Sequence, residues 1–154
     1  EFDLIHLKKI HKYIFGDIYE WAGEIRWVNI AKGNMFCNYE FIEANADSLF
    51  DRLRRENYLM DASKEEIPFR LSYYLSEINV LHPFREGNGR AQRLFIEYLA
   101  ENAGYSVDFS QVTDRQMIEA SAASFLCDYT KMNELFSAIT SPLQENTMTQ
   151  TFME

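Results

Sequence analysis

The sequence predicts an all-α fold, a helical bundle that carries one small β-hairpin. Apolar residues recur at helical spacing over most of the 154 residues. The chain has 6 Gly and 3 Pro, which favours long helices over a sandwich of many short strands. One stretch, residues 25–37, has the alternation and the glycine turn of a hairpin. The length predicts one domain over residues 1–140, with a polar tail over 141–154.

The first two elements are a helix and the hairpin. The helix is expected over residues 3–15, where apolar side chains share one face: Leu4, Leu7, Ile10, Ile14 and Phe15. In the hairpin, β-forming residues alternate over 25–30, the sequence Lys-Gly-Asn at 32–34 offers a turn, and residues 35–37 return.

Two helices in the middle of the chain are predicted from their caps. Asn38 can cap a helix over residues 39–57. Ser63 and Glu66 have the spacing of a capping box, which opens a helix that runs to about Leu81.

The last three helices are expected over residues 89–102, 113–127 and 131–140. Gly104 stands where a helix commonly ends, just after the first of them. Thr113 and Gln116 repeat the capping-box pattern at the start of the second.

Composition excludes several classes of protein. The net charge of −9 makes direct nucleic-acid binding a poor expectation. Cys37 and Cys127 are far apart and unpatterned, which argues against a disulfide framework or zinc site and favours a reducing cytoplasm. No run of about 18 apolar residues exists that would span a membrane. A chain that begins at Glu1 without signal-peptide character is expected to be part of a longer protein.

The stretch HPFREGNGR, residues 82–90, predicts an anion site. Consecutive N–H groups of the Gly-Asn-Gly turn at 87–89 form a concave nest, and the helix that starts there adds partial positive charge. Arg90 and Arg93 are three apart and therefore share one helix face, while Arg85 adds a third charge nearby. A polyphosphate is the ligand that this cluster suits.

Three other side chains of the stretch have separate roles. Glu86 would repel phosphate unless Mg²⁺ bridged the two, which predicts a bound magnesium ion. His82 stands where a helix passes into the loop and could take a proton from an attacking hydroxyl. Phe84 is expected in the core, where it fixes the loop. Together they predict a phosphoryl- or nucleotidyl-transfer site.

These residues resemble the signature of the Fic domain, His-x-Phe-x-(Asp/Glu)-Gly-Asn-Gly-Arg-x-x-Arg. Residues 82–93 read HPFREGNGRAQR, with no departure from it. Residues 20–37, EWAGEIRWVNIAKGNMFC, are similar to the segment that leads into the family's flap hairpin. The resemblance covers roughly residues 3–140, and the family's helical fold agrees with the elements above.

The resemblance implies AMPylation, the transfer of AMP from ATP to a Tyr, Ser or Thr hydroxyl of a target protein with release of pyrophosphate. By motif position, His82 is the base and Glu86 holds Mg²⁺. The phosphates are held by Gly87, Asn88, Gly89, Arg90 and Arg93. The hairpin would be the flap that docks the target by strand addition, through Asn29, Ile30, Ala31, Lys32, Gly33 and Asn34.

Relatives of this kind are often inhibited by a helix with the pattern (Ser/Thr)-x-x-x-Glu-(Gly/Asn), whose glutamate pairs with the second motif arginine. One match exists here, formed by Ser141, Glu145 and Asn146. Pro142 suits a first helical position, so a short helix could start there. The tail is polar and non-periodic, which favours an upstream segment or a separate antitoxin as the inhibitor instead.

Other readings stay open. A Fic-fold enzyme could transfer UMP, phosphocholine or phosphate, or could remove AMP. A binding module with an inactive site would be expected to lack the motif histidine or glutamate, and both are present. A metal-dependent hydrolase needs more ligands than one glutamate, and His6 and His11 are wrongly spaced and expected to be surface or partly buried helix residues. A toxin of a toxin–antitoxin pair, or an effector that acts in a host cell, is an analogy only.

Overall fold

A computed structural model describes residues 1–143 and confirms the all-α fold. Its helices are α1 Leu4–Phe15, α2 Ile42–Arg55, α3 Ile67–Leu81, α4 Asn88–Asn102, α5 Asp114–Phe125 and α6 Thr130–Ile139. Its strands are β1 Ala31–Lys32, β2 Asn34–Met35, β3 Tyr105–Val107 and β4 Thr140–Pro142. Short 3₁₀ turns cover Tyr39–Phe41, Asn57–Leu59 and Phe109–Gln111. No helix within residues 1–143 combines the length and the apolar character needed to cross a membrane.

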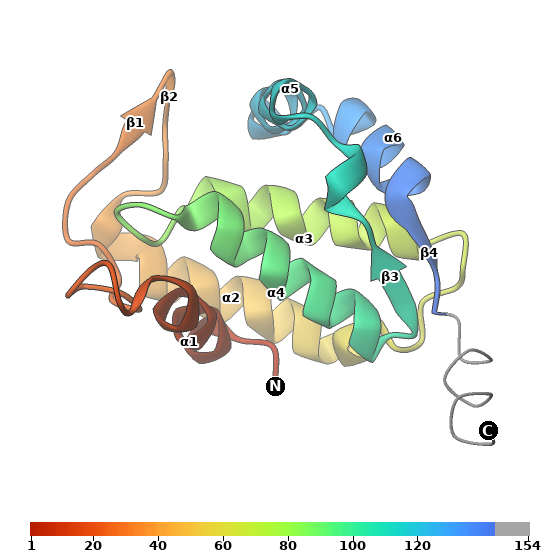
Figure 1. The fold of residues 1–154 in the computed structure, drawn as a ribbon, viewed down its shortest axis with the longest axis horizontal. Coiled ribbons are helices and arrows are strands. Elements are labelled where there is room, and N and C mark those ends of the chain that lie inside the picture. Colours follow the sequence, from red (N-terminus) through yellow and green to blue (C-terminus); the bar gives the residue numbers. More distant parts are fainter. Residues whose placement is uncertain (144–154) are drawn as a thin grey trace.

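Helices α3 and α4 lie side by side at the centre of the bundle (Figure 1). On one side α1 packs on α4 and α2 packs on α3; on the other, α3 contacts α5 and α6. The core forms where these helices meet, from fully buried side chains that include Leu71, Leu75, Ile78, Phe95 and Leu99. The centre of the fold therefore supports both ends of the loop that joins α3 to α4.

Both predicted capping boxes form their hydrogen bonds, but only Thr113 stands directly before its helix, because α3 begins at Ile67 and not at Ser63. The Ser63 hydroxyl accepts the Glu66 N–H at 3.2 Å, and the Thr113 hydroxyl accepts the Gln116 N–H at 3.1 Å. Gly104 follows α4 with a φ of +94°, as expected for a glycine that ends a helix. These signals are local, which is why sequence alone located them.

The hairpin is shorter than predicted. Its register pairs Ala31 with Met35 and Lys32 with Asn34, whereas residues 25–30 form no strand. The backbone of Arg26 bonds elsewhere: its N–H donates to the Pro83 carbonyl at 2.9 Å. The alternating residues thus attach the base of the hairpin to the loop after α3 instead of extending the strand.

A second strand pair was not predicted. Strand β3 pairs antiparallel with β4, and Ser106 lies opposite Ser141. Three-residue strands give too little alternation to be detected, and the partners are 35 residues apart. The pairing places Ser141 and Pro142 in strand β4.

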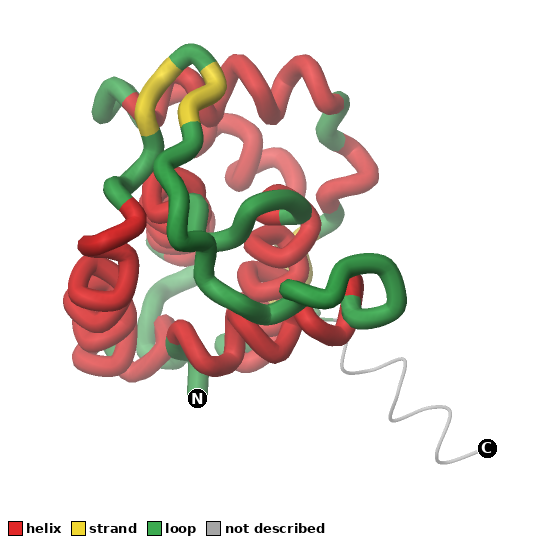
Figure 2. Tube along the Cα trace, turned by 90° about the vertical axis from the view of Figure 1, so that its left-hand side faces the viewer, coloured by secondary structure: helices red, strands yellow, loops and turns green. Residues whose placement is uncertain are grey.

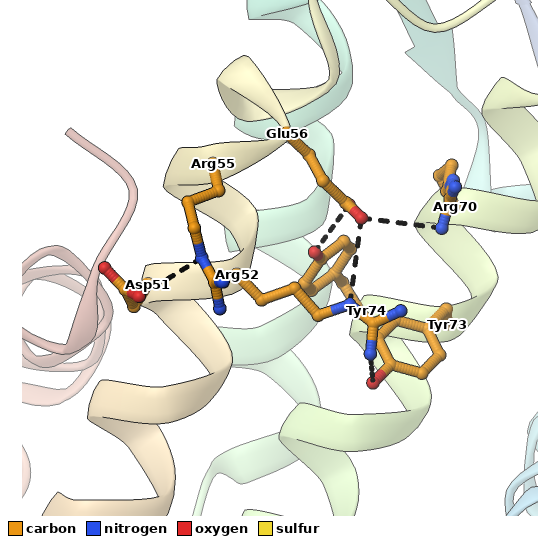
Figure 3. Close-up of polar contacts among 7 residues, drawn as sticks. All are labelled: Asp51, Arg52, Arg55, Glu56, Arg70, Tyr73 and Tyr74. Atoms are coloured by element: carbon orange, nitrogen blue, oxygen red, sulfur yellow. Dashed lines mark hydrogen bonds and ion pairs between the residues drawn. The ribbon is translucent and has the colours of Figure 1, made fainter.

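Charged side chains cross-link α2 to α3 (Figure 3). The Tyr74 hydroxyl donates to Glu56 at 2.6 Å, and burial together with this carboxylate raises the pKa of Tyr74. Arg70 and Arg52 approach the same carboxylate at 3.5 and 3.8 Å. Arg52 also stacks over the Tyr73 ring. Because every charge in this network has a partner, we interpret it as a structural clamp.

Candidate nucleotide-phosphate site

The loop that joins α3 to α4 lies at one end of the bundle, next to the hairpin β1–β2 (Figure 1). Figure 2 looks onto this end, where the hairpin and long loops gather. The Cys37 N–H, just after β2, donates to the Val80 carbonyl of α3 at 3.0 Å. This contact ties one stem of the hairpin to the helix that leads into the motif.

Two side chains shape the motif loop from within. Phe84 is fully buried, as predicted. The Asn88 amide accepts the Phe84 N–H at 2.9 Å and donates to the Phe84 carbonyl at 2.7 Å. The Asn88 side chain thus closes the loop, a role that sequence analysis missed because only the turn itself was considered.

His11 supports the same loop from α1, and the expectation of a surface or partly buried side chain is wrong. The side chain is fully buried, and its ring stacks on Phe84 at a centroid distance of 3.9 Å. The Gly23 N–H donates to Nδ1 at 2.9 Å, so Nε2 carries the hydrogen and donates to the Glu86 carbonyl at 2.8 Å. Burial lowers the pKa of His11, in agreement with a neutral ring.

The two glycines of the turn differ in how closely an added Cβ would meet its neighbours. Gly87 has a φ of +78°, and a Cβ there would stand 2.3 Å from the Phe15 ring. A Cβ on Gly89 would stand 3.1 Å from the Arg93 guanidinium, so this glycine lets Arg93 fold back over the first turn of α4. The first N–H groups of α4, which have no acceptor within the helix, remain available to an anion.

Gly87→Ala is expected to destabilise the fold by about 2–4 kcal/mol, from the left-handed backbone and the collision with Phe15 together. Gly104→Ala is the matched control: its φ is also positive, at +94°, but an added Cβ would meet no atom of residues 1–143 within 4 Å. Urea unfolding of both variants measures the difference. Equal losses of stability would show that the contact with Phe15 carries no cost.

In contrast to the α2–α3 clamp, the motif charges have no ion-pair partner in the part of the chain that the structure describes. Among residues 1–143, none of Arg85, Glu86, Arg90 and Arg93 makes an ion pair within 4.0 Å. Arg85, Glu86 and Arg90 are exposed, and Arg93 is partly buried. Three cations and one carboxylate without internal partners suit a ligand that is itself a polyanion.

Two of these arginines are oriented by aromatic rings. The Arg85 guanidinium lies 5.8 Å from the Trp21 ring centre and 5.6 Å from that of Trp27. Arg90 lies 5.3 Å from the ring centre of Phe15. Rings hold a guanidinium through cation–π attraction while its N–H groups stay free.

His82 ends α3 in a left-handed conformation, with a φ of +44°. The ring is 8% exposed and stacks on Phe36, from the hairpin side, at a centroid distance of 3.7 Å. Burial lowers the pKa of His82 to about 4; the positive charge of Lys32 contributes, and the Asn79 backbone carbonyl opposes the shift. Nδ1 makes no hydrogen bond of normal geometry to any residue within 1–143. The ring is therefore neutral at pH 7 and able to accept a proton.

The His82 ring is expected to stay uncharged down to about pH 4 instead of titrating near 6.5. Its contribution to folding stability is then complete above pH 6.5 and is lost as the pH falls toward 4, because the unfolded chain binds the proton first. A pH titration of the imidazole NMR signals, assigned with His82→Asn, measures the midpoint. A midpoint near 6.5 would contradict the burial of this ring.

The motif and the hairpin share a cleft of about 470 Å³. The motif contributes His82, Gly89 and Arg93, and the opposite wall comes from α5, with Met117, Ile118 and Ser121 among its residues. Other lining residues were not predicted to belong to this cleft. Lys32 and Asn34 were predicted only as contacts of the target protein, and no role was predicted for Phe36, Asn79 or Gln92. Gln92 donates to Asn79 at 3.1 Å.

The predicted docking residues lie on the hairpin and its first stem. Ala31, Lys32 and Gly33 are exposed, while Ile30 and Asn34 are partly buried. Asn29 is engaged within the chain, because its side-chain oxygen accepts the Tyr39 N–H at 2.9 Å. The backbone edge of the hairpin is thus the part left open to a partner.

The candidate inhibitory pattern falls only partly within the described residues. Glu145 and Asn146 lie outside them. Ser141 and Pro142 belong to β4, so the helix start expected at Pro142 is wrong. Strand β4 lies at the opposite end of the bundle from the hairpin, beside the end of α4, whereas Arg93 is in the first turns of α4 (Figure 1).

A metal ion at this site would need the phosphates of the bound substrate to complete its coordination. Within residues 1–143, no group of three or more His, Cys, Asp or Glu side chains is arranged to hold a metal ion. Glu86 alone offers an exposed carboxylate in the loop. One carboxylate fits Mg²⁺, which is commonly bound by one or two carboxylates together with substrate phosphates and water.

Fold and site together define a class of helical domain in which a cationic, glycine-bounded turn at a helix start lies next to a hairpin and a buried neutral histidine. A sequence model of the Fic/DOC family matches residues 1–100. The chain belongs to this family.

Among its relatives, protein adenylyltransferase VbhT of Bartonella schoenbuchensis is 48% identical over 126 residues. The match covers 81% of this chain but only 26% of that protein, so this chain spans about a quarter of its length. The probable protein adenylyltransferase Fic of Escherichia coli is 38% identical over 144 residues, which covers 93% of this chain and 72% of that protein.

Solved structures share the fold. The Fic domain of a Bartonella quintana effector with bound ADP superposes with a TM-score of 0.91 at 30% identity, over 96% of this chain and 77% of that one. BepC of Bartonella tribocorum with bound AMPPNP gives 0.89 at 29%, over 93% and 76%. The similarity thus includes proteins that bind adenine nucleotides.

Proposed function

We propose that this chain transfers AMP from ATP to a hydroxyl group of a target protein and releases pyrophosphate. The observation that carries the proposal is the juxtaposition in one cleft of a buried, neutral His82 with Arg93 at the start of α4. Two relatives are named as protein adenylyltransferases, one of them as a probable one, and this agrees with the proposal.

The phosphate contacts follow from the charges left unpaired. The N–H groups at the turn of residues 87–89 and the positive end of α4 hold phosphate oxygens. Arg90 steadies the leaving phosphates, and Arg93 binds the γ-phosphate end. Because both side chains lack ion-pair partners within 1–143, no ion pair among these residues must break when ATP binds.

His82 acts as the general base. The target hydroxyl oxygen attacks the α-phosphorus and gives its proton to the His82 ring. The bond from the α-phosphorus to the bridging oxygen breaks, and pyrophosphate leaves with that electron pair. A pKa near 4 keeps the ring in its accepting form at pH 7, although a weak base takes the proton only as the P–O bond forms.

Glu86 is the residue that would hold Mg²⁺ together with the phosphates. The ion would neutralise phosphate charge and fix the orientation of the polyphosphate. The role of the chain itself is to present the carboxylate: the His11 ring donates to the Glu86 carbonyl and thereby fixes the backbone from which this side chain extends.

The target docks as an extra strand on the hairpin. The reaction takes place in a reducing cytoplasm, either that of the producing cell or that of a host cell. Phe36 N–H bonds to the Ile30 carbonyl, so by antiparallel alternation the next pair, Ala31 and Met35, directs its backbone groups outward. Main-chain pairing of this kind needs little sequence from the target.

Ala31→Pro is expected to lower transfer to protein at least tenfold, because it removes an outward N–H donor from the hairpin edge. Affinity for ATP should remain within about twofold, since the phosphate contacts are in the motif. Ala31→Ser keeps the N–H and should transfer normally. Equal losses in the two variants would indicate recognition by side chains instead.

The inhibitor is proposed to be an upstream segment or a separate antitoxin. The first residue of the candidate internal pattern, Ser141, is paired in β4 at the end of the molecule away from Arg93. A helix from an upstream segment or a separate protein is not held at that end of the molecule by a strand pairing. Activity of this chain with and without its native flanking sequence tests the proposal.

The alternative is a Fic-fold enzyme with another donor or the reverse reaction. A panel of ATP, UTP and CDP-choline, followed by mass spectrometry of modified protein, separates them. We expect an AMP adduct from ATP alone. A UMP or phosphocholine adduct, or loss of AMP from a pre-modified protein without any transfer, would favour the alternative.

A further inference from the structure

Arg26 is a buried cation that has no carboxylate partner among residues 1–143. Its side chain is 2% exposed, and among residues 1–143 it makes no ion pair within 4.0 Å. Its donors reach only backbone carbonyls. Nε donates to His82 at 2.7 Å, and Nη1 donates to Val28 at 2.7 Å. Nη2 donates to Cys37 and, at 3.3 Å, to Leu81.

Two of these carbonyls belong to the end of α3. The last carbonyls of a helix have no partner within it and carry partial negative charge, which a cation stabilises. Leu81 is the last residue of α3, and His82 follows in the left-handed conformation with its φ of +44°. A non-glycine residue in that conformation persists when its surroundings hold it there. The bond from Arg26 Nε to the His82 carbonyl is one such restraint.

The other two carbonyls belong to the hairpin stems. Val28 precedes β1 and Cys37 follows β2, so one guanidinium grips the hairpin on both sides. The Arg26 N–H also donates to Pro83, the residue after His82. The planar guanidinium of Arg26 therefore holds the β1–β2 hairpin and the backbone of His82 in one fixed arrangement.

We propose that Arg26 is a positioning residue for the transfer reaction, holding His82 and both stems of the β1–β2 hairpin in one register. A target strand docked on the hairpin is thereby aligned with the base. This inference rests on the proposed function, since alignment matters only if a docked hydroxyl is attacked from the hairpin side. Small misplacements of reacting groups can cost up to about 100-fold in rate.

The test compares four proteins: wild type, Arg26→Met, Arg26→Lys and Leu53→Ala. Methionine removes all donors at similar length, whereas lysine keeps the charge but loses the planar fork. Leu53 is fully buried in α2 and serves as a destabilised control outside the site. Transfer kinetics, ATP affinity by calorimetry, and NMR signals of the His82 ring and hairpin amides are recorded where circular dichroism shows each protein folded.

We expect Arg26→Met to lower the rate of transfer to protein about 30-fold and Arg26→Lys to fall between it and wild type. Affinity for Mg·ATP should stay within about threefold in both. The His82 and hairpin signals should move in the Arg26 variants, while Leu53→Ala should lose thermal stability but keep its rate and these signals. If Arg26→Met does not fold, Arg26→Lys carries the same three measurements.

The proposal is overturned if the Arg26 variants keep the wild-type rate within twofold, if Leu53→Ala loses as much rate, or if ATP affinity falls in parallel with rate. Failure of the proposed function would look different, because wild type itself would then transfer no AMP. In that case the NMR signals decide alone: unchanged His82 and hairpin signals in Arg26→Met reject the positioning role, and displaced signals in that variant alone support it.

Discussion

We expect His82→Ala to lower AMP transfer by about 10³-fold or more, while affinity for Mg·ATP stays within a few fold. General base catalysis contributes on the order of 10²–10⁴ in rate, and the base acts only when the hydroxyl attacks. Nucleotide binding depends on other groups: the turn at residues 87–89, Arg90, Arg93 and Glu86. Transfer of label from ATP and calorimetry of ATP binding measure the two effects separately.

The backbone at His82 calls for a matched second variant. Its φ of +44° is tolerated by asparagine better than by alanine, so His82→Asn removes the base with less strain. Both variants should lose transfer. A wild-type rate in either would reject the base assignment, and loss of ATP binding in both would assign His82 a structural role.

The second large effect is expected for Glu86→Ala. Transfer should fall by about 100-fold, and ATP binding should lose most of its dependence on Mg²⁺, because no second carboxylate of the motif can hold the ion. Glu86 is exposed and makes no ion pair within residues 1–143, so the change should cost little stability.

ATP titrations with and without Mg²⁺ give the measurement for Glu86. Glu43→Ala, which removes an exposed carboxylate from α2, is the control for net charge and should behave as wild type. If wild type and Glu86→Ala respond equally to Mg²⁺, Glu86 does not hold the metal.

Sequence predicted the motif loop well because its parts are adjacent along the chain. The turn at residues 87–89 and the helix that follows form a local structure, and Phe84 is apolar enough to indicate its burial. The hydrogen bonds of the Ser63 and Thr113 capping boxes are equally local, and both form, although α3 begins only at Ile67. The fold class could also be predicted, because helical periodicity is a pattern among residues that are close together in the sequence.

Long-range support could not be predicted in the same way. Arg26 is one residue of the alternating segment 25–30 and carries no signal of its own, yet it binds carbonyls 55 and 56 positions away. His11 contacts a residue 75 positions away, and a lone histidine on a helix gives no sign of that. Strands β3 and β4 are too short to leave a pattern. These contacts depend on how the helices pack, which periodicity does not specify.

The central claim is the transfer of AMP, and the position of the label in ATP tests it most directly. The protein is incubated with a cell lysate and with ATP labelled at either the α- or the γ-phosphate, and modified proteins are analysed by mass spectrometry. We predict that α-label becomes bound to protein, that γ-label leaves as pyrophosphate, and that the adduct is AMP on a hydroxyl side chain, all of it absent with His82→Asn. Protein labelled from the γ-phosphate, or no His82-dependent label from the α-phosphate, would contradict the account.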